Sequence, residues 1–328
     1  MREGIKSVFR PLYHSYLAVR YRGRARKILQ DYAEQHREAQ QTYRAAGHIP
    51  SLSVSSLKDV RVRRIDPKGR ESFIRLQGDY RALIDRISHD VEAKLGYVRN
   101  CWFFPKLKVP PAHDKVTDLE AVRNGEVIAV QLKDYLGVEG LNELCAHLIP
   151  EIEKKIYGSY VLVDKVYVYR NLVSHVKEQV SWTWHYDNHP VEILKVMIYL
   201  TDVSESNGPF EYLRSSRTME GIYRTPTPLS GYGRVSSREV QGYLAEGAES
   251  QKVTGPRGTL LLFDDNVVHK ANVAQSGYRD VIVLQLRPCT LRQRSFISSS
   301  HTGSFEHVDF SQDPWQYAPI SKQTMVSG

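Results

Sequence analysis

The chain has few cysteines, no long apolar run and almost no acidic residues at its start. Its three cysteines, Cys101, Cys145 and Cys289, lie far apart among 328 residues and are odd in number. This argues against a disulfide framework and for a reducing compartment, although three buried core thiols would account for them equally well. No stretch is apolar enough to span a bilayer, and no signal peptide with a cleavage site is recognisable. We therefore expect a cytoplasmic globular protein.

The net charge of +8 is concentrated at the N-terminus. Residues 1–27 hold eight Lys or Arg against Glu3 alone, together with an apolar stripe of helical period. Such a segment either packs on a core or lies on an anionic membrane surface, so a peripheral contact at the inner membrane surface is the alternative to simple packing. No helix-turn-helix, zinc-finger or RNP-like pattern accompanies the charge, and nucleic acid is not expected as a partner.

The periodicity of the chain changes near its middle. Residues 17–46, 79–95 and 140–156 have helical composition, and glycines at 47, 96 and 158 can end these helices. After Gly158, short runs rich in β-branched and aromatic residues predict strands at 161–169, 181–186, 193–200, 210–213, 259–263, 267–270 and 281–286. Many short strands after a helical front end predict an α+β chain with a β-barrel or sandwich core.

This division predicts three regions. A helical N-terminal region, 1–158, packs on a catalytic core at 159–290, and a polar tail, 291–328, follows. Residues 218–250 are too many for a plain loop and are rich in Gly, Ser and Tyr, which makes them a candidate lid over the site.

His185-Tyr-Asp187 is the most informative motif, because alternate residues of a strand project from one face. We expect both side chains at the end of a strand, 181–184, with a turn after it in which His189 faces solvent. His269 arrives from a different strand. Two histidines and one carboxylate form the facial triad of non-haem Fe(II) oxygenases, which leaves three coordination positions open.

Arg279 follows His269 by ten residues. A turn at 271–278 predicts a hairpin that brings Arg279 back beside the strand of His269. A planar guanidinium binds a carboxylate bidentately, which suits 2-oxoglutarate as co-substrate. The His-x-Asp spacing alone is weak evidence, since His307-Val-Asp309 repeats it in the polar tail without a strand or a later His and Arg.

Several motifs together resemble the phytanoyl-CoA dioxygenase-like family, over roughly residues 160–288. They are Trp184-His-Tyr-Asp187, the run 195–203, Ser206-Asn-Gly-Pro209, the run 258–263, His269 and Arg279. The resemblance implies a double-stranded β-helix core, Fe(II) held by His185, Asp187 and His269, and Arg279 on the distal carboxylate of 2-oxoglutarate, with O2 as the oxidant. Retention of Asp187 implies hydroxylation or desaturation rather than halogenation. The sequence departs from the family at Val281, where a small hydroxylic residue is common, and at 214–217.

Six further residues have weaker assignments, each with a plainer alternative. Lys195, in mid-strand, binds a carboxylate of the cofactor or substrate, or guards an edge strand. Tyr167 and Tyr169 share one strand face, where they either bind 2-oxoglutarate or pack in the core. Gln285 and Arg287 share the face of Arg279 and line a substrate cavity or pack there, and Asn207 contacts substrate or only forms a turn.

Three functional hypotheses remain open from the residues. The first is an Fe(II)/2-oxoglutarate hydroxylase of a small-molecule, carrier-linked or lipid-linked substrate in a biosynthetic or tailoring pathway. The basic N-terminus favours an anionic substrate for it, such as a phosphorylated glycolipid or a CoA thioester. The second is a metal-dependent hydrolase, which needs neither Arg279 nor oxygen. The third is a catalytically silent β-barrel binding module.

Overall fold

The computed structural model describes the central part of the chain, and both ends lie outside it. The described residues are 26–27, 29–65, 80–107, 113–176, 180–215, 221–225, 233–292 and 295–297. The basic segment up to residue 25, most of the polar tail and the second His-x-Asp motif at His307 therefore lie outside the described residues.

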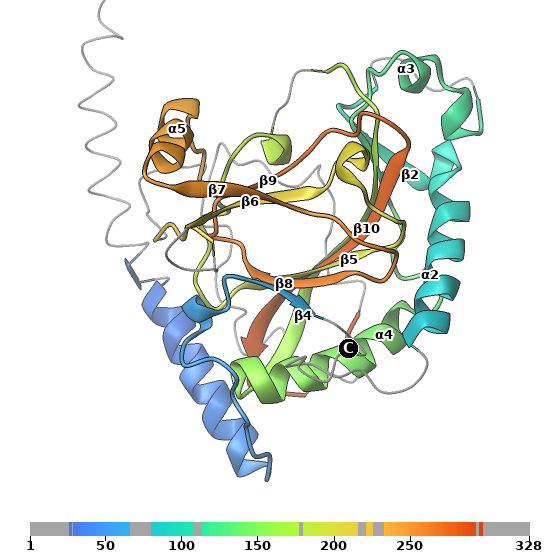
Figure 1. Cartoon of the computed structure of the whole chain (residues 1–328). Helices are drawn as coiled ribbons and strands as arrows, with labels where there is room; N and C mark the ends of the chain where they lie inside the picture. Colours follow the sequence, from blue (N-terminus) through green and yellow to red (C-terminus); the bar gives the residue numbers. More distant parts are fainter. Residues whose placement is uncertain are drawn as a thin grey trace, which may run out of the picture.

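Two antiparallel sheets lie one above the other (Figure 1). The large sheet has the order β1-β8-β5-β10-β4-β3-β2 and the small sheet the order β7-β6-β9. With the helices outside them, the two sheets form the predicted α+β fold, a double-stranded β-helix core. The strands are β1 Val62–Ile65, β2 Cys101–Phe104, β3 Ala129–Leu132, β4 Tyr160–Leu172, β5 Leu194–Tyr199, β6 Phe210–Ser215, β7 Ala248–Val253, β8 Leu260–Asp264, β9 His269–Ala271 and β10 Tyr278–Cys289.

The large sheet is buried on both faces, which explains the continuous apolar runs of its strands. Alternation along β5 divides its side chains between the two faces: Val196 and Ile198 belong to the outer core, Met197 and Tyr199 to a smaller inner cluster. The inner cluster also contains Phe210 from the small sheet, so it fills the space between the sheets. By the same alternation, Lys195 of β5 and Arg279 of β10, two residues of the predicted site, lie on this inner face.

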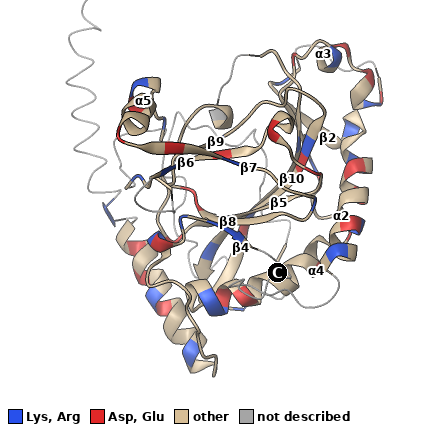
Figure 2. Ribbon diagram, viewed as in Figure 1, with Lys and Arg blue, Asp and Glu red and all other residues tan. Residues whose placement is uncertain are grey.

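Helices cover the outer face. The outer core includes Leu83 and Ile87 of α2 and Leu144 and Leu148 of α4, and Figure 2 shows acidic and basic residues interspersed along these helices while the central strands are largely uncharged. The helices are α2 Tyr80–Leu95, α3 Glu120–Arg123, α4 Leu141–Ile152 with a π-helical turn Glu153–Tyr157, α5 Ser237–Ala245, a helical segment within 29–45, and the 3-10 turns Leu57–Asp59, Val98–Asn100, Val116–Asp118, Val180–Trp182 and Glu205–Asn207.

The N-terminal region is less purely helical than predicted. It contributes β1, β2 and β3 to the large sheet. Each of these strands has only four residues, and β1 reads Val-Arg-Arg-Ile, so neither length nor periodicity marks them in the sequence. Within the candidate lid, 218–250, the last residues already belong to β7, which pairs with β6.

Two predictions about the site strands were wrong. Residues 181–186 do not form a strand: Val180–Trp182 is a 3-10 turn, and His185 makes only isolated bridges. The predicted hairpin is absent too, because β9 pairs with β6 in the small sheet whereas β10 lies between β4 and β5 in the large one. The chain crosses between the two sheets after His269, as neighbouring strands of a double-stranded β-helix do, so Arg279 faces the site from the opposite layer.

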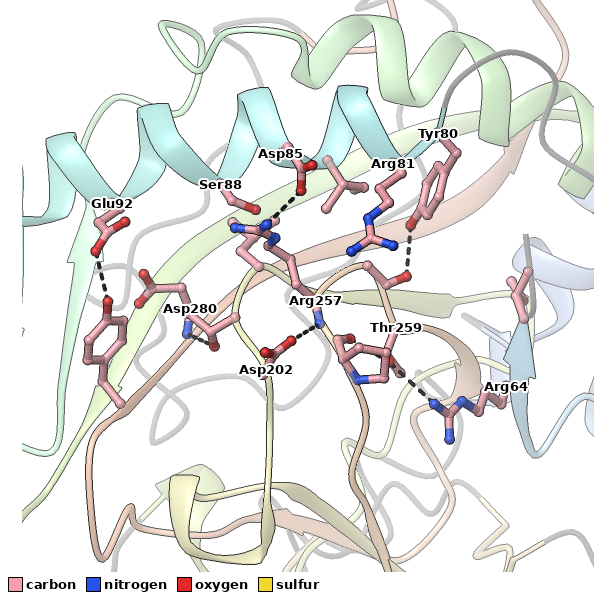
Figure 3. A pocket seen from close by; sticks show the side chains of 17 residues that line it. Arg64, Tyr80, Arg81, Asp85, Ser88, Glu92, Asp202, Arg257, Thr259 and Asp280 are labelled. Carbon is pink, nitrogen blue, oxygen red and sulfur yellow. Dashed lines mark hydrogen bonds and ion pairs between the residues drawn. The ribbon is translucent and has the colours of Figure 1, made fainter. Parts of the chain in front are cut away.

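A hollow of about 850 Å³ lies between α2 and the ends of β5 and β10 (Figure 3). Its lining residues include Asp85, Arg257 and Tyr278, and none of His185, Asp187 and His269 is among them. Among the described residues, no helix has the length and apolarity that crossing a membrane requires. The three cysteines are buried, and none of them forms a disulfide.

Candidate metal centre

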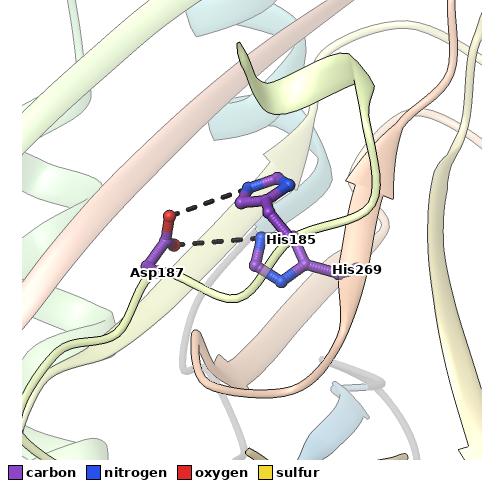
Figure 4. A group of neighbouring side chains, drawn as sticks. All are labelled: His185, Asp187 and His269. Carbon is purple, nitrogen blue, oxygen red and sulfur yellow. Dashed lines mark ion pairs between the residues drawn. The ribbon is translucent and has the colours of Figure 1, made fainter. Parts of the chain in front are cut away.

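His185, Asp187 and His269 converge between the two sheets (Figure 4). The backbones of His185 and His269 exchange two hydrogen bonds, with N···O distances of 2.9 and 2.8 Å, which fixes the two imidazoles side by side with ring centroids 4.3 Å apart. The Asp187 amide donates to the carbonyl of Asp265 at 2.8 Å. One ligand atom from each of the three side chains lies within 4.8 Å of the others.

On the side away from His269, residues 233–235 form backbone hydrogen bonds with the segment that contains His185 and Asp187. Tyr186 N–H donates to the Gly233 carbonyl at 2.6 Å, and Val235 N–H donates to that of Trp184 at 3.0 Å. A Cβ at position 233 would lie 1.7 Å from the carbonyl oxygen of Tyr186, so only glycine permits this approach. Backbone contacts on both sides thus replace the strand that the sequence predicted here.

Hydrogen bonds orient both imidazoles in the same way. His185 Nδ1 lies 2.8 Å from the carbonyl oxygen of Thr183, and His269 Nδ1 lies 2.7 Å from that of Val267. A protonated Nδ1 donating to each carbonyl leaves Nε2 with its lone pair, the arrangement that metal-binding histidines usually have. The two Nε2 atoms face the Asp187 carboxylate at 3.7 and 3.8 Å. The donor set of two imidazole nitrogens and one carboxylate therefore fits Fe(II).

The protonation states suit a metal. Burial lowers the pKa of His185 to about 3 and also lowers the pKa of His269. Burial raises the pKa of Asp187, but the positive charge of Lys195 and the neighbouring histidines outweigh it, and the pKa falls below its ordinary value. At neutral pH the site therefore presents two neutral imidazoles and a carboxylate, the forms that bind metal.

Arg279 lies on the inner face of β10, on the face of Val281 and Val283. It is fully buried, and none of its three guanidinium nitrogens has a hydrogen-bond partner among the described residues. Its guanidinium carbon lies 5.8 Å from the ring centroid of Tyr199. A buried cation without an anion is strongly unfavourable, so this position calls for an anionic partner from outside the chain.

Lys195 lies beside Asp187 rather than at a sheet edge. β5 is flanked by β8 and β10, so the edge-strand alternative is wrong. Its Nζ lies 2.5 Å from Asp187 Oδ2 and 3.6 Å from Asp265 Oδ2. The nearest anions to this lysine are thus side chains of the chain itself.

Two of the other predicted residues pack against the inner cluster, and two bind an aspartate. Tyr167 and Tyr169 are half-buried and pack against the inner cluster that also contains Tyr199. Gln285 and Arg287 both bind Asp164: Gln285 Nε2 donates to Oδ2 at 3.1 Å, and Arg287 lies 2.9 Å from Oδ1.

Asn207 takes part in a turn. Its side-chain Oδ1 accepts a hydrogen bond from Ser204 N–H, and its Nδ2 donates to the carbonyl of Ser276. Both polar atoms of the amide are therefore engaged within the turns that surround it.

Sequence reasoning missed Asp265 and misplaced His189. His189 was expected to face solvent, but it is buried, and its Nδ1 lies 2.6 Å from Asp265 Oδ2. The reason is a reciprocal pair of hydrogen bonds between His189 and Asn266, which docks the turn after Asp187 onto the turn before His269. The sequence did contain a signal for a buried acidic group here: Asp264 and Asp265 stand between two apolar runs, and residues between such runs are often buried.

Comparison with known proteins agrees with this geometry. Residues 142–279, which contain the three converging side chains and Arg279, match the family described as phytanoyl-CoA dioxygenase. An L-proline trans-4-hydroxylase of Streptomyces griseoviridis is 24% identical over 230 residues, which cover 59% of this chain and 84% of that protein. The resemblance predicted from the sequence is thereby confirmed.

Several solved structures align with the chain. EctD from S. alaskensis aligns with a TM-score of 0.45 and 14% identity over 73% of this chain and 80% of its own. HygX from Streptomyces hygroscopicus, solved with nickel, 2-oxoglutarate and hygromycin B, aligns with a TM-score of 0.40 and 13% identity over 72% and 86%.

Proposed function

We propose that this chain, which matches the phytanoyl-CoA dioxygenase family over residues 142–279, hydroxylates an unactivated C–H bond of a small-molecule substrate. Its class is that of the Fe(II)- and 2-oxoglutarate-dependent dioxygenases. The observation that carries the proposal is the pairing of two features: a His, Asp, His set with both Nε2 atoms free for a metal, and a buried arginine with no anion of its own.

In this proposal His185, Asp187 and His269 are the metal ligands. Iron held there would couple the oxidative decarboxylation of 2-oxoglutarate to hydroxylation of the substrate. The carbonyls of Thr183 and Val267 keep each Nδ1 protonated and each Nε2 directed at the metal position. Asp187 supplies the negative charge that makes the set selective for a divalent cation.

Arg279 binds the distal carboxylate of 2-oxoglutarate. The fully buried guanidinium provides donors in a fixed fork that matches a carboxylate. The inner cluster around it, with Tyr199, Val281 and Phe210, excludes water and strengthens this ion pair. Tyr167 and Tyr169 pack against the same cluster, and in this proposal their hydroxyls are candidate hydrogen-bond partners of the co-substrate.

The substrate in this proposal is a small polar or anionic molecule. The related hydroxylase acts on L-proline by its name, which favours a free small molecule over a macromolecule. The eight basic residues within 1–27 favour an anionic group, such as a phosphate or a CoA thioester, or a lipid-linked form presented at a membrane. Sedimentation with anionic vesicles, with and without residues 1–27, separates the two forms: the membrane version is excluded if both proteins stay in the supernatant.

Anaerobic titration with Fe(II) and 2-oxoglutarate tests the proposal, with the visible metal-to-ligand charge-transfer band as readout. We expect a band in the wild type, none in His269→Ala, and in Arg279→Ala a band that requires far more 2-oxoglutarate. Arg257→Ala, which removes an arginine of the hollow, is the matched control and should titrate like the wild type. A folded wild type that binds zinc and gives no band would favour a hydrolase instead.

A further inference from the structure

Lys195 places an ammonium group between two carboxylates in the middle of the large sheet. Phe263 of β8 and Gln285 of β10 lie opposite it on either side. Its side chain is only 14% exposed. A cation so far from water is stable only because both Asp187 and Asp265 lie against it.

The groups around this ammonium form a second candidate ligand set beside the first. Asp187, His189 and Asp265 each offer one ligand atom within 4.8 Å of the others. Asp187 belongs to both sets, and Asp265, which is fully buried, has an Oδ1 with no hydrogen-bond partner among the described residues. The second set thus consists of two carboxylates and an imidazole, and Asp187 connects it to the first set. Two ligand sets joined by one carboxylate resemble a two-metal site, in which the ions typically lie about 3.5–4 Å apart.

We infer that the Lys195 ammonium takes the position of a second metal ion and so keeps the centre mononuclear. The inference rests on the proposed function, since it presumes a divalent ion at His185, Asp187 and His269. Lys195 is a positioning residue in this account. It neutralises Asp265 and engages one oxygen of Asp187, so that Asp187 cannot chelate a metal through both oxygens.

The alternative taken from the sequence, a contact between Lys195 and a carboxylate of 2-oxoglutarate, is less well supported by the contacts of the ammonium. The ammonium is already held by two anions of the chain. Arg279, which has none, is the better-placed partner for the distal carboxylate.

Metal stoichiometry tests the inference. The full-length protein is titrated anaerobically with Mn(II), and bound metal is measured by EPR and elemental analysis in wild type, Lys195→Ala and Lys195→Ala/His189→Ala. We expect one ion in the wild type and two in Lys195→Ala, with an EPR signal from two coupled ions. We expect one again in the double variant, because His189 is a ligand of the second site alone. Lys252→Ala, which removes an exposed lysine from β7, should bind one ion like the wild type.

Two further variants make the outcome decisive. Lys195→Arg retains a cation and should bind one ion. Lys195→Ser gives a second small side chain if the alanine variant does not fold, and should bind two. A folded Lys195→Ala or Lys195→Ser protein with one ion and the wild-type spectrum would overturn the inference. A folded wild type that binds no Mn(II) at all would instead contradict the proposed function.

Discussion

The candidate metal centre and the hollow beside α2 differ in whether their charged groups have partners within the chain. Two pairs of side chains in the hollow bind each other: Arg257 lies 2.9 Å from Asp85, and the Tyr278 hydroxyl lies 2.8 Å from Glu92. Between the sheets, the three nitrogens of Arg279 lack partners among the described residues, and the Nε2 atoms of His185 and His269 lie beyond hydrogen-bond distance of Asp187. The paired side chains of the hollow thus differ from the Arg279 guanidinium, which has no anion of its own.

This difference separates packing from function. A buried polar group without a partner costs roughly 1–3 kcal/mol, and more when it is charged, so a fully buried cation without an anion calls for a ligand. A charge that already has its partner has no such requirement. The unpaired guanidinium of Arg279, rather than the volume of a cavity, is therefore the feature that supports the proposed site.

The largest effect is expected where a paired buried charge loses its partner. Arg170 makes two hydrogen bonds of 2.7 Å to Asp280, which lines the hollow, and both side chains are less than 10% exposed. Arg170→Met leaves the Asp280 carboxylate buried alone and should lower the free energy of unfolding by about 3–5 kcal/mol. Urea denaturation measures this, and Arg170→Met/Asp280→Asn should recover part of the loss. A loss under about 1 kcal/mol would mean that the hollow does not depend on its internal pairing.

The opposite result is expected for Arg279→Leu. The metal-free protein should be as stable as the wild type or more so, because the substitution removes a buried cation that has no partner. The affinity for 2-oxoglutarate with Fe(II) present should fall by about 100-fold, roughly 3 kcal/mol, through loss of a bidentate charge-assisted contact. Calorimetry of the two proteins measures both. Destabilisation as large as that of Arg170→Met would show that Arg279 is an ordinary structural arginine.

The next effect is a pH dependence. Burial lowers the pKa of His185 to about 3, whereas an unfolded chain binds that proton near pH 6.5. Between these values the unfolded state holds the extra proton, so stability falls as the pH falls, by about 1.4 kcal/mol per pH unit for one histidine.

His185→Gln should therefore flatten the slope of unfolding free energy against pH between 4.5 and 6.5 by about that amount. Urea denaturation of the metal-free protein at several pH values measures it. Glu153 and Glu192, whose pKa values burial raises to about 7, act in the opposite direction, but the substitution leaves them in place. His269→Gln should act like His185→Gln, because burial lowers that pKa too. An unchanged slope in both variants would place these rings in contact with water.

The sequence predicted the strands that depend on local propensity, but not the segments that depend on contacts with residues distant in the chain. The strands β4, β5, β8 and β10 were predictable, because long runs of β-branched and aromatic residues favour strands wherever they lie. The segment 181–186 has similar composition but is held by backbone contacts to 233–235 and to His269, which local propensity does not encode. The short strand β1 is stabilised by pairing with β8 rather than by its own residues.

The same reasoning applies to the metal centre. His185, Asp187, His269 and Arg279 could be proposed because their residue types and order along the chain are characteristic. The contacts of Lys195 could not, since Asp265 reaches it only after residues 187–189 dock onto 264–266. A residue is thus easier to identify from sequence than the neighbours that set its role.

The smallest effect is expected for Arg257→Met in the hollow. Its ion pair with Asp85 is short, but the two side chains are 45% and 43% exposed, so solvent screens the attraction. Such pairs contribute about 0–1 kcal/mol, and the backbone amide of residue 257, which donates to Asp202, is unaffected by the substitution.

We expect a change in unfolding free energy below about 1 kcal/mol, and no change in Mn(II) stoichiometry or in the affinity for 2-oxoglutarate. Urea denaturation and the titrations above measure all three. A large loss of co-substrate affinity would show that the hollow is coupled to the metal centre, since none of His185, Asp187 and His269 lines it. The two regions would then form one functional unit, in which the Arg257–Asp85 ion pair of the hollow affects how Arg279 binds 2-oxoglutarate.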